Sequence, residues 1–261
     1  MNLSGKRVLI TGASRGIGEQ LALEFAGAGA RVALVARSES TIKELAERLG
    51  GTAHPADLSD PDQTQGLIAR VEGDGGPIDV LVNNAADERA GALLSLAPSD
   101  LVAQVHLNLT APIELARQAV PGMIQRGGGH IVNVSSLGGT NAVPGVASYS
   151  ATKAGLSHFT AALRAEFKGT PIKTTLVELG PVNTEMMQHL YDYPPTDRAV
   201  TRIRHLGLIK QVAPDHVARN IRQAVEHDRR HVRMPKRGAL YPLLVEAPRR
   251  ITEWLLVGVR P

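Results

Sequence analysis

The chain alternates short apolar runs, which are typical of β-strands, with longer stretches of helical periodicity. The strand-like runs are nearly continuous in apolar residues, as strands buried on both faces require. Strands separated by helices predict an α/β fold with a doubly wound parallel sheet of about seven strands and helices on both faces. We expect strands at residues 6–10, 31–36, 52–57, 78–84, 130–136, 172–179 and 231–234.

Helical periodicity fills the intervals between these runs. We expect helices over residues 16–30, 39–50, 61–72, 98–125, 149–167 and 214–228, with a break near Asn108. Residues 185–197, rich in Met, Tyr and Pro, are expected to form a loop. No internal repeat, linker or low-complexity tract divides the sequence. We therefore expect residues 1–261 to form one domain, with a variable substrate loop and C-terminal segment at 185–261.

Three glycines lie in "TGASRGIG" (11–18), between the first predicted strand and an amphipathic helix. In a doubly wound sheet this turn is the phosphate site, because glycines let the backbone approach a ligand and the helix N-terminus favours negative charge. The spacing T-G-x-x-x-G-x-G differs from the common G-x-G-x-x-G fingerprint. Its position after the first strand nevertheless predicts a Rossmann-type dinucleotide-binding domain.

The absence of cysteine excludes disulfides, thiolate catalysis and Cys-ligated zinc, and we expect no metal site. The N-terminus enters the first strand almost at once and leaves no room for a signal peptide. No apolar run approaches the ~18 residues of a membrane span. We therefore expect a cytoplasmic protein without a transmembrane span.

Charge is unevenly distributed along the chain. Residues 198–261 hold 14 basic and 5 acidic residues, whereas residues 1–197 hold 15 and 20. A basic tail can bind nucleic acid, anionic lipid or an acidic protein, but a solvated helical surface has the same pattern and is favoured. Aromatic residues are 3% of the chain, which argues against stacking on bases, so we expect no nucleic-acid partner.

Four separated motifs resemble those of the short-chain dehydrogenase/reductase family, in that family's order and spacing. They are "TGASRGIG" (11–18), "LVNNAA" (81–86), "HIVNVSSLGG" (130–139) and "YSATK" (149–153). The resemblance extends to about Thr184. It implies an enzyme that interconverts a ketone or aldehyde and an alcohol by hydride transfer, in which the nicotinamide cofactor carries the hydride.

The resemblance implies four catalytic residues: Asn108, Ser136, Tyr149 and Lys153. Tyr149 and Lys153 are four residues apart, so they share a helix face, and the ammonium is expected to lower the pKa of the phenol from its usual ~10. Tyr149 would then act as acid or base. The family's spacing between serine and tyrosine selects Ser136 over Ser135 as the hydroxyl that binds the reacting oxygen. Asn108 would hold a water that connects Lys153 to solvent.

Cofactor contacts are also implied by the resemblance. Asp57 is expected beside the adenine, although an aspartate in "ADLSD" is also a common turn or N-cap residue. Ala86 replaces a family glycine, which would strain a backbone that needs positive φ, and Leu179 replaces a proline, which would leave the loop less rigid. The expected cofactor-binding residues are Gly12, Ser14, Arg15, Gly16, Ile17, Gly18, Arg37, Asp57, Leu58, Asn83, Ala85, Tyr149, Lys153, Gly180, Val182 and Thr184.

The end of the second predicted strand lacks the acid that binds the ribose 2′-hydroxyl of NAD. There "VALVARSES" offers Ala36 and Arg37, and the first acid is Glu39. Arg37 can face a 2′-phosphate with a forked pair of donors, and Arg15 in the glycine turn adds a second cation. We therefore expect NADP(H) to be favoured over NAD(H).

The substrate pocket is expected from residues 86–94, 137–146 and 185–210. Its apolar side chains indicate an apolar or lipid-like carbonyl or alcohol substrate; they are Val143, Met186, Met187, Leu190, Tyr191 and Tyr193. Several cations would also suit an acyl-carrier or CoA thioester, which makes a 3-oxoacyl thioester reductase the alternative. They are Arg198, Arg202, Arg204, His205 and Lys210.

The apolar stretch 239–259 contains Arg249 and Arg250, and Pro248 would break or kink a helix there. A subunit interface of a homodimer or homotetramer is favoured over contact with a membrane surface.

Two other classes of protein are alternatives to an oxidoreductase. A non-catalytic cofactor-binding sensor or structural protein would be supported by an incomplete Asn-Ser-Tyr-Lys set, and all four residues are present. A sugar-nucleotide epimerase or dehydratase would carry T-G-x-x-G-x-x-G, which "TGASRGIG" does not fit.

Overall fold

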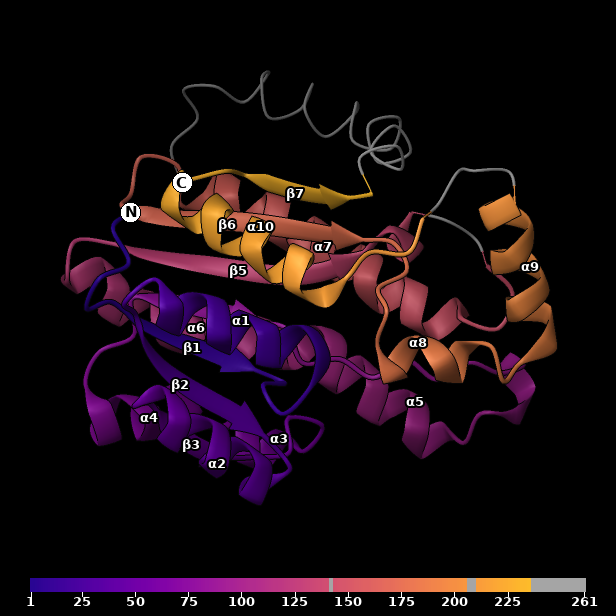
Figure 1. Cartoon of the computed structure of the whole chain (residues 1–261), viewed down its shortest axis with the longest axis horizontal. Coiled ribbons are helices and arrows are strands. Elements are labelled where there is room, and N and C mark those ends of the chain that lie inside the picture. Colours follow the sequence, from indigo (N-terminus) through magenta and orange to yellow (C-terminus); the bar gives the residue numbers. More distant parts are fainter. Residues whose placement is uncertain (141–142, 206–209, 236–261) are drawn as a thin grey trace.

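A computed structural model describes residues 1–140, 143–205 and 210–235. Seven strands form one sheet in the order β3-β2-β1-β4-β5-β6-β7, and every neighbouring pair is parallel (Figure 1). The predicted α/β fold with a doubly wound parallel sheet is confirmed. The strands are β1 (Arg7–Thr11), β2 (Arg31–Ala36), β3 (Thr52–Pro55), β4 (Val80–Asn83), β5 (Gly129–Ser136), β6 (Ile172–Leu179) and β7 (His231–Met234).

Helices cover both faces of the sheet. One face packs against α1, α2 and α10 through a core that includes Phe25, Ile42 and Ile221. The other packs against α4, α6 and α7 through a core that includes Leu67 and Leu115. These helices are α1 (Gly16–Gly27), α2 (Glu39–Leu49), α4 (Leu67–Gly75), α6 (Ala111–Gln125), α7 (Ala147–Glu166) and α10 (Pro214–Glu226).

The strand order reverses between β1 and β4. From β1 the chain proceeds outwards to β2 and β3, and then returns to the other side of β1 as β4. Ligands of doubly wound sheets bind at such a reversal, outside the carboxyl ends of the strands. Three further helices lie at this end of the sheet (Figure 1): α5 (Pro98–Val105), α8 (Glu185–Leu190) and α9 (Pro194–His205).

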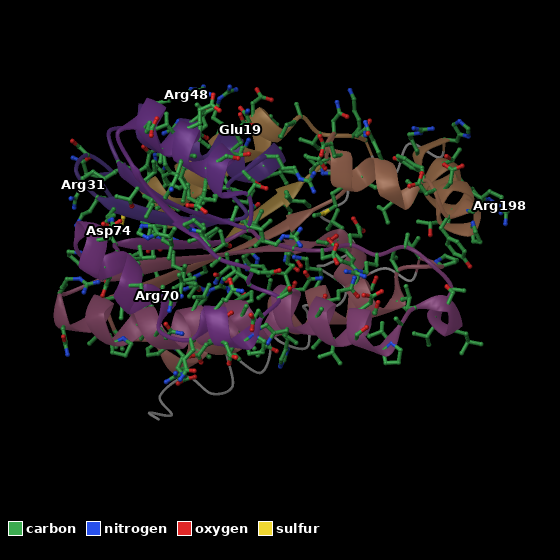
Figure 2. The ribbon with its side chains drawn as sticks, turned by 90° about the horizontal axis from the view of Figure 1, so that it is seen from below. Glu19, Arg31, Arg48, Arg70, Asp74 and Arg198 are labelled. Carbon is green, nitrogen blue, oxygen red and sulfur yellow. The ribbon has the colours of Figure 1, made fainter. Side chains whose placement is uncertain are left out.

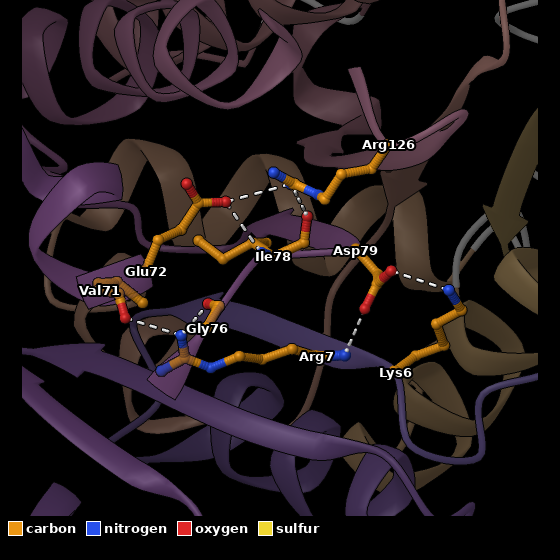
Figure 3. A network of polar contacts seen from close by, with 8 residues as sticks. All are labelled: Lys6, Arg7, Val71, Glu72, Gly76, Ile78, Asp79 and Arg126. Carbon is orange, nitrogen blue, oxygen red and sulfur yellow. Dashed lines mark hydrogen bonds and ion pairs between the residues drawn. The ribbon is translucent and has the colours of Figure 1, made fainter. Parts of the chain in front are cut away.

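A polar network at the opposite end of the sheet joins the beginnings of β1 and β4 to the end of α4 (Figure 3). Arg7, which is 2% exposed, donates to the carbonyl oxygens of Val71 and Gly76. The Asp79 carboxylate accepts from Lys6 Nζ at 2.9 Å and from the Arg7 backbone N–H at 2.8 Å. Because buried charges are costly unless they are paired and hydrogen-bonded, these contacts fix the amino ends of the strands.

Two predicted helices are divided. Residues 61–72 form α3 (Pro61–Thr64) and part of α4, because Gly66 between them takes a left-handed φ of 65°. Residues 98–125 form α5 and α6, separated by a π-helical turn at His106–Thr110. The expected break near Asn108 is therefore a local change of helical pitch rather than an end of the helix.

The expectation of a loop over 185–197 is wrong, because these residues form α8 and the start of α9. Met187 and Leu190 are buried in an apolar cluster with Val146 and Tyr149, and this packing stabilises the short helix α8. Pro194 begins α9, a position where its missing N–H costs nothing.

The C-terminal stretch 239–259 lies outside the described residues. Arg198, Arg202 and Arg204 of α9 are exposed, and Figure 2 shows Arg198 pointing away from the molecule at one end. None of the described helices is long and apolar enough to cross a membrane. The described residues also bring no three His, Asp or Glu side chains together as a metal site would require.

Candidate active site

A cavity of about 1210 Å³ opens at the carboxyl ends of β1, β4, β5 and β6. The turns after these strands supply much of its wall, and residues of α7, α8 and α9 supply more. Of the catalytic and cofactor-binding residues expected from the sequence, all but Asn83 and Asn108 line it. The cavity therefore gathers, from segments far apart in the chain, the groups that the motifs single out.

The glycine turn packs directly against the segment after β4. Gly12 has a φ of +67°, and a Cβ there would lie 2.8 Å from Ala85 Cα. A Cβ on Gly18 would lie 2.0 Å from the Gly12 carbonyl oxygen. Steric contact alone therefore requires glycine at both positions. Because α1 begins at Gly16, the unpaired N–H groups of its first turn lie at the cavity wall, where they can bind phosphate.

Thr11 and Asn84 hold the two turns together, and the sequence reading missed both. Thr11 Oγ1 accepts hydrogen bonds from the backbone N–H groups of Asn84 and Ala85, each at 3.0 Å. Asn84 Nδ2 donates to the Thr11 carbonyl oxygen at 2.9 Å. Asn83 lies away from the cavity, and its Nδ2 donates to Asn133 Oδ1 at 2.8 Å in the core. The threonine before the first glycine and the second asparagine of "NN" were the available signals.

Tyr149 and Lys153 come from one face of α7, and their side chains line the cavity. Lys153 Nζ lies 5.7 Å from the centroid of the Tyr149 ring and donates to the Val134 carbonyl oxygen at 2.9 Å. This geometry places a cation beside the phenol, as expected from the sequence.

The ionisation of this pair differs from the expectation. Burial raises the pKa of Tyr149 and the charge of Glu88 raises it further, while a hydrogen bond with Ser136 opposes the shift. Burial also lowers the pKa of Lys153 to about 8, against the opposite influence of Glu88. The expected lowering of the pKa of Tyr149 is therefore not found, because removal from water dominates and the charge of Glu88 adds to it.

The two serines at the end of β5 have different partners. Ser136 Oγ accepts from the Gly138 N–H at 3.0 Å and donates to the Leu179 carbonyl oxygen at 3.3 Å. Ser135 Oγ donates to the Lys153 carbonyl oxygen at 2.8 Å, so it joins β5 to α7. The Ser135 hydroxyl is thus used in a contact within the fold, and Ser136 stays the serine that the sequence predicts for the reacting oxygen.

Asn108 is fully buried in the π-helical turn and does not line the cavity. Its Oδ1 accepts from the Asp87 N–H at 2.9 Å, and its Nδ2 donates to the Asp87 carbonyl oxygen at 2.8 Å. Nδ2 also lies 3.2 Å from Thr152 Oγ1 on α7. Asn108 therefore connects the segment after β4 to the helix that carries Tyr149 and Lys153.

The segment held by Asn108 carries Glu88, a cavity-lining residue that the sequence reading missed. Burial raises the pKa of this carboxyl to about 7; the charge of Lys153 opposes the shift and that of Asp87 adds to it. The sequence feature that could have identified Glu88 is an ionisable residue two positions after "NNAA".

Arg37, Asp57 and Leu58 line the part of the cavity beyond the glycine turn. Burial acts to raise the pKa of Asp57, but hydrogen bonds from Ser59 and the charge of Arg37 outweigh it, so this pKa is lowered. The Asp57 carboxylate accepts from the Ser59 N–H at 2.9 Å and from its hydroxyl at 2.7 Å. Asp57 thus closes a local turn, the second role considered for it from the sequence.

The two cations expected beside a 2′-phosphate differ in their contacts. Arg15 forms an exposed ion pair with Glu185 of α8 at 2.5 Å, which bridges the glycine turn to the segment after β6. Within the described part of the chain, no ion pair engages Arg37. Arg37 is therefore the cation that is open to a ligand.

The segment after β6 lies against the glycine turn. Gly180 donates its N–H to the Met234 carbonyl oxygen at 2.7 Å. A Cβ on Gly16 would lie 3.3 Å from Thr184 Cγ2, so the two turns adjoin each other at the cavity wall. Val182, the third expected contact, is 6% exposed and forms a parallel bridge with Val212.

Both departures from the family pattern are accommodated. Among the described residues, Asp228 is the one residue other than glycine with positive φ, so Ala86 does not bear the strain expected of it. Leu179 ends β6 as a buried, paired residue opposite Ser136 and Met234. Pairing with β5 and β7, rather than a proline ring, fixes the backbone at this position.

The outer part of the cavity is apolar. Val143, Met186, Met187 and Leu190 line it as expected, whereas Tyr191 and Tyr193 do not. The sequence reading did not single out several other apolar lining residues: Leu107, Leu137, Val146 and Val200. Together with the glycine turn and Arg37, these residues give the cavity both a part suited to phosphate groups and a largely apolar part.

Comparison with known proteins agrees with this geometry. Residues 6–194 match the family model described as short chain dehydrogenase. A short chain dehydrogenase of Pseudocercospora fijiensis is 38% identical over 192 residues, which are 70% of this chain and 62% of the relative. The ketoacyl reductase HetN of a Nostoc species is 39% identical over 180 residues, with 67% and 63% covered. The matched region thus spans less than two thirds of both relatives.

Two solved structures share the fold. A short-chain dehydrogenase from Streptomyces avermitilis has a TM-score of 0.78 at 29% identity, covering 97% of this chain and 97% of its own. A metagenomic short-chain oxidoreductase in complex with NADP has a TM-score of 0.69 at 32% identity, covering 85% of this chain and 91% of its own.

Proposed function

Because this chain belongs to the short-chain dehydrogenase family, we propose that it is an NADP-preferring oxidoreductase that interconverts a ketone or aldehyde and an alcohol. The observation that carries the proposal is the meeting of Ser136, Tyr149 and Lys153 in the cavity bordered by the glycine turn. A phenol, an ammonium and a hydroxyl in one desolvated site are suited to proton exchange with a carbonyl or carbinol oxygen.

A bound nicotinamide would supply or accept the hydride. Tyr149 holds the proton at its phenol oxygen, since burial and Glu88 both raise its pKa. Ser136 positions the substrate oxygen beside that phenol. Lys153, fixed by the Val134 carbonyl oxygen, stabilises the negative charge on Tyr149 once the proton has left. Asn108 would hold a water molecule that connects Lys153 to solvent.

Preference for NADP(H) rests on Arg37. Arg37 lines the cavity beyond the glycine turn, where a 2′-phosphate would lie, and it follows β2 in place of an acid. Arg15 is the second cation on that side, and a phosphate there would compete with Glu185 for it. The relative solved with NADP is consistent with this preference.

Fluorescence titrations with NADPH and with NADH test the proposal. We expect NADPH to bind at least about tenfold more tightly, which corresponds to about 1.4 kcal/mol. A screen of apolar ketones and aldehydes with NADPH should then yield turnover. Tighter binding of NADH would overturn the preference, and binding of neither by folded protein would favour a sensor or structural role.

A 3-oxoacyl thioester reductase is the second candidate. Helix α9 contributes Thr196 and Val200 to the cavity and exposes Arg198 and Arg202, so an anionic carrier docked there would reach the same site. A relative named as a ketoacyl reductase is consistent with this function. The test is a comparison of a carrier-bound 3-oxoacyl thioester with a simple ketone of the same chain length; equal kcat/KM values would contradict carrier recognition.

We also propose that the protein is a homodimer or homotetramer. Apolar side chains cluster in exposed positions on and before α5, with Leu93 59%, Leu94 99% and Val102 70% exposed. Exposed apolar patches of this kind mark contact surfaces. Light scattering coupled to size-exclusion chromatography tests the proposal, and a monomer at micromolar concentration would overturn it.

A further inference from the structure

Glu88 is an ionisable group in the candidate active site that the proposed mechanism does not use. Its side chain lines the same cavity as Tyr149 and Lys153, and its charge acts on both. It lies on the segment whose backbone is held by Asn108 through Asp87. The position of Glu88 is therefore fixed relative to α7, which carries the reacting groups.

No hydrogen bond or ion pair satisfies the Glu88 carboxyl within the described part of the chain. The neighbouring cation on its own segment, Arg89, is paired with Asp87 at 2.7 Å and with Asp100 at 2.5 Å. Lys153, the cation that faces Glu88 from α7, donates to the Val134 carbonyl oxygen. Both oxygens of the Glu88 carboxyl are thus free to accept a hydrogen bond.

Glu88 is partly exposed and lines the cavity rather than the core. A ligand that fills the cavity would displace water from this carboxyl, which is costly unless the ligand supplies a hydrogen-bond donor. The cavity wall already removes part of the hydration of Glu88, which raises the pKa of its carboxyl to about 7. Natural proteins retain carboxyls without a partner at sites where a ligand supplies the hydrogen-bond donor. A donor on the substrate would restore the missing hydrogen bond.

The charges around Glu88 indicate which donor suits it. Lys153 on α7 and Asp87 on the same segment are the charged groups that act on it, and the Tyr149 phenol lies in the same cavity. An ammonium on the substrate would be repelled by Lys153, which shares the cavity. A hydroxyl is neutral and can donate to the carboxyl whether or not the carboxyl carries a proton.

We propose that Glu88 anchors the substrate: its carboxyl accepts a hydrogen bond from a hydroxyl group next to the reacting carbon. The substrate class is then a hydroxy ketone, or the corresponding vicinal diol, with an otherwise apolar body that contacts Val143, Met187 and Leu190. This inference rests on the proposed oxidoreductase function and narrows its substrate. Glu88 is thus a specificity residue of the same cavity.

Paired substrates test the anchor. The kcat/KM values of the NADPH-dependent reaction are measured for 2-octanone and 1-hydroxy-2-octanone with the wild-type enzyme, with Glu88→Leu and with Glu88→Gln. We expect the wild type to prefer the hydroxy ketone by at least about tenfold. Glu88→Leu should abolish this preference, because kcat/KM should fall for the hydroxy ketone and stay unchanged for 2-octanone. Glu88→Gln, which keeps an acceptor oxygen, should retain most of it.

A binding readout keeps the test independent of turnover. Thermal shifts in the presence of NADPH are compared for 2-octanol and 1,2-octanediol with the same three proteins. A loss of the diol's thermal shift in Glu88→Leu, with that of 2-octanol unchanged, would support the anchor even if the wild type reduced neither ketone. Failure of the wild type to reduce either ketone would count against the proposed function and not against the anchor.

Three results would overturn the anchor. The first is an equal fall in kcat/KM for both ketones in Glu88→Leu, which would mean that Glu88 acts through Tyr149 and Lys153. The second is a wild-type enzyme that does not distinguish the hydroxylated compound from its partner, either in kcat/KM or in the thermal shift. The third is a stronger effect of 1-amino-2-octanol than of the diol, which would identify an ammonium as the donor.

Discussion

The side-chain amide of Asn108 is hydrogen-bonded to both backbone polar groups of Asp87, at 2.9 Å to its N–H and 2.8 Å to its carbonyl oxygen. Asn108 lies in the π-helical turn between α5 and α6, whereas Asp87 lies on the segment after β4. One amide thus fixes the part of the cavity wall that carries Glu88.

Replacement of Asn108 by alanine should destabilise the fold and misplace this wall. Two backbone groups of Asp87 lose their partners, so we expect a loss of about 3 kcal/mol in the free energy of unfolding. Urea denaturation measures it. Asn220→Ala, which removes an exposed amide from α10, is the matched control and should change stability by less than about 0.5 kcal/mol. Equal effects of the two changes would contradict the role of Asn108.

Replacement of Tyr149 by phenylalanine should remove turnover and preserve cofactor binding. The phenol oxygen is the proposed proton donor, and acid–base groups contribute about 10²- to 10⁴-fold to the rate. We expect kcat on a confirmed substrate to fall by that factor, with the Kd for NADPH changed less than about threefold. Tyr191→Phe removes a phenol that does not line the cavity and should leave kcat unchanged. A Tyr149→Phe enzyme with the wild-type rate would refute the catalytic assignment.

Replacement of Arg37 by alanine should weaken NADPH binding selectively. Loss of a charged, forked donor to the 2′-phosphate should raise the Kd for NADPH at least about tenfold, while the Kd for NADH stays within about twofold. Fluorescence titration measures both constants. Arg48→Ala removes an exposed arginine of α2 outside the cavity and serves as the control. A similar loss for both cofactors would show that Arg37 does not read the 2′-phosphate.

Replacement of Gly18 by alanine should disrupt the turn itself. The new Cβ would lie 2.0 Å from the Gly12 carbonyl oxygen, so backbone must move. We expect a loss of at least about 2 kcal/mol of stability, with impaired cofactor binding. At Gly73 in α4 a Cβ meets nothing within 4 Å, so Gly73→Ala should stabilise the protein by about 0.5–1 kcal/mol. Chemical denaturation of both variants checks the contrast.

Acid should destabilise the protein through His130, which is 1% exposed and whose pKa burial lowers from 6.5 to about 4. The Thr175 hydroxyl donates to the Arg229 carbonyl oxygen, so neutral His130 must donate its Nε2–H to Thr175 Oγ1. Because the unfolded chain binds the proton more readily, stability is full above pH 6.5 and is lost as pH falls towards 4. The shift corresponds to about 3 kcal/mol.

Urea denaturation at pH 7.5 and pH 5 tests this dependence. Relative to wild type, His130→Gln should lose about 2 kcal/mol less stability between the two values. His158→Gln, on the exposed side of α7, is the control and should follow the wild type. An unchanged pH dependence in His130→Gln would contradict the assignment.

Much of the fold could be predicted from the sequence, because strands buried on both faces leave a continuous apolar signature. β2, β6 and β7 have the expected bounds, and β5 differs by one residue. The segment 185–197 was misjudged because α8 depends on tertiary burial of Met187 and Leu190 rather than on local periodicity. A short helix stabilised by distant contacts leaves little trace in its own residues.

The candidate site was only partly predictable, for a different reason. Motif residues such as Tyr149 and Lys153 can be recognised in the sequence by their type and spacing. Thr11 and Asn84 act through hydrogen bonds between segments 73 positions apart, and Glu88 acquires its raised pKa from a cavity wall built by several strands. Burial and partner identity are properties of the assembled sheet, so the reversal of the pKa shift expected for Tyr149 could not be read from a one-dimensional pattern.

The packing of α1 against α10 has a consequence for synthesis on the ribosome. Leu21 and Phe25 of α1 belong to the same buried core as Ile221 of α10, although about 200 positions separate them in the chain. The part of the apolar surface of α1 that contacts α10 therefore stays uncovered until nearly all of the sheet has been translated. Long-range pairing of this kind slows folding and exposes nascent chains to aggregation. A chain released before Pro214 should depend on chaperones to stay in solution.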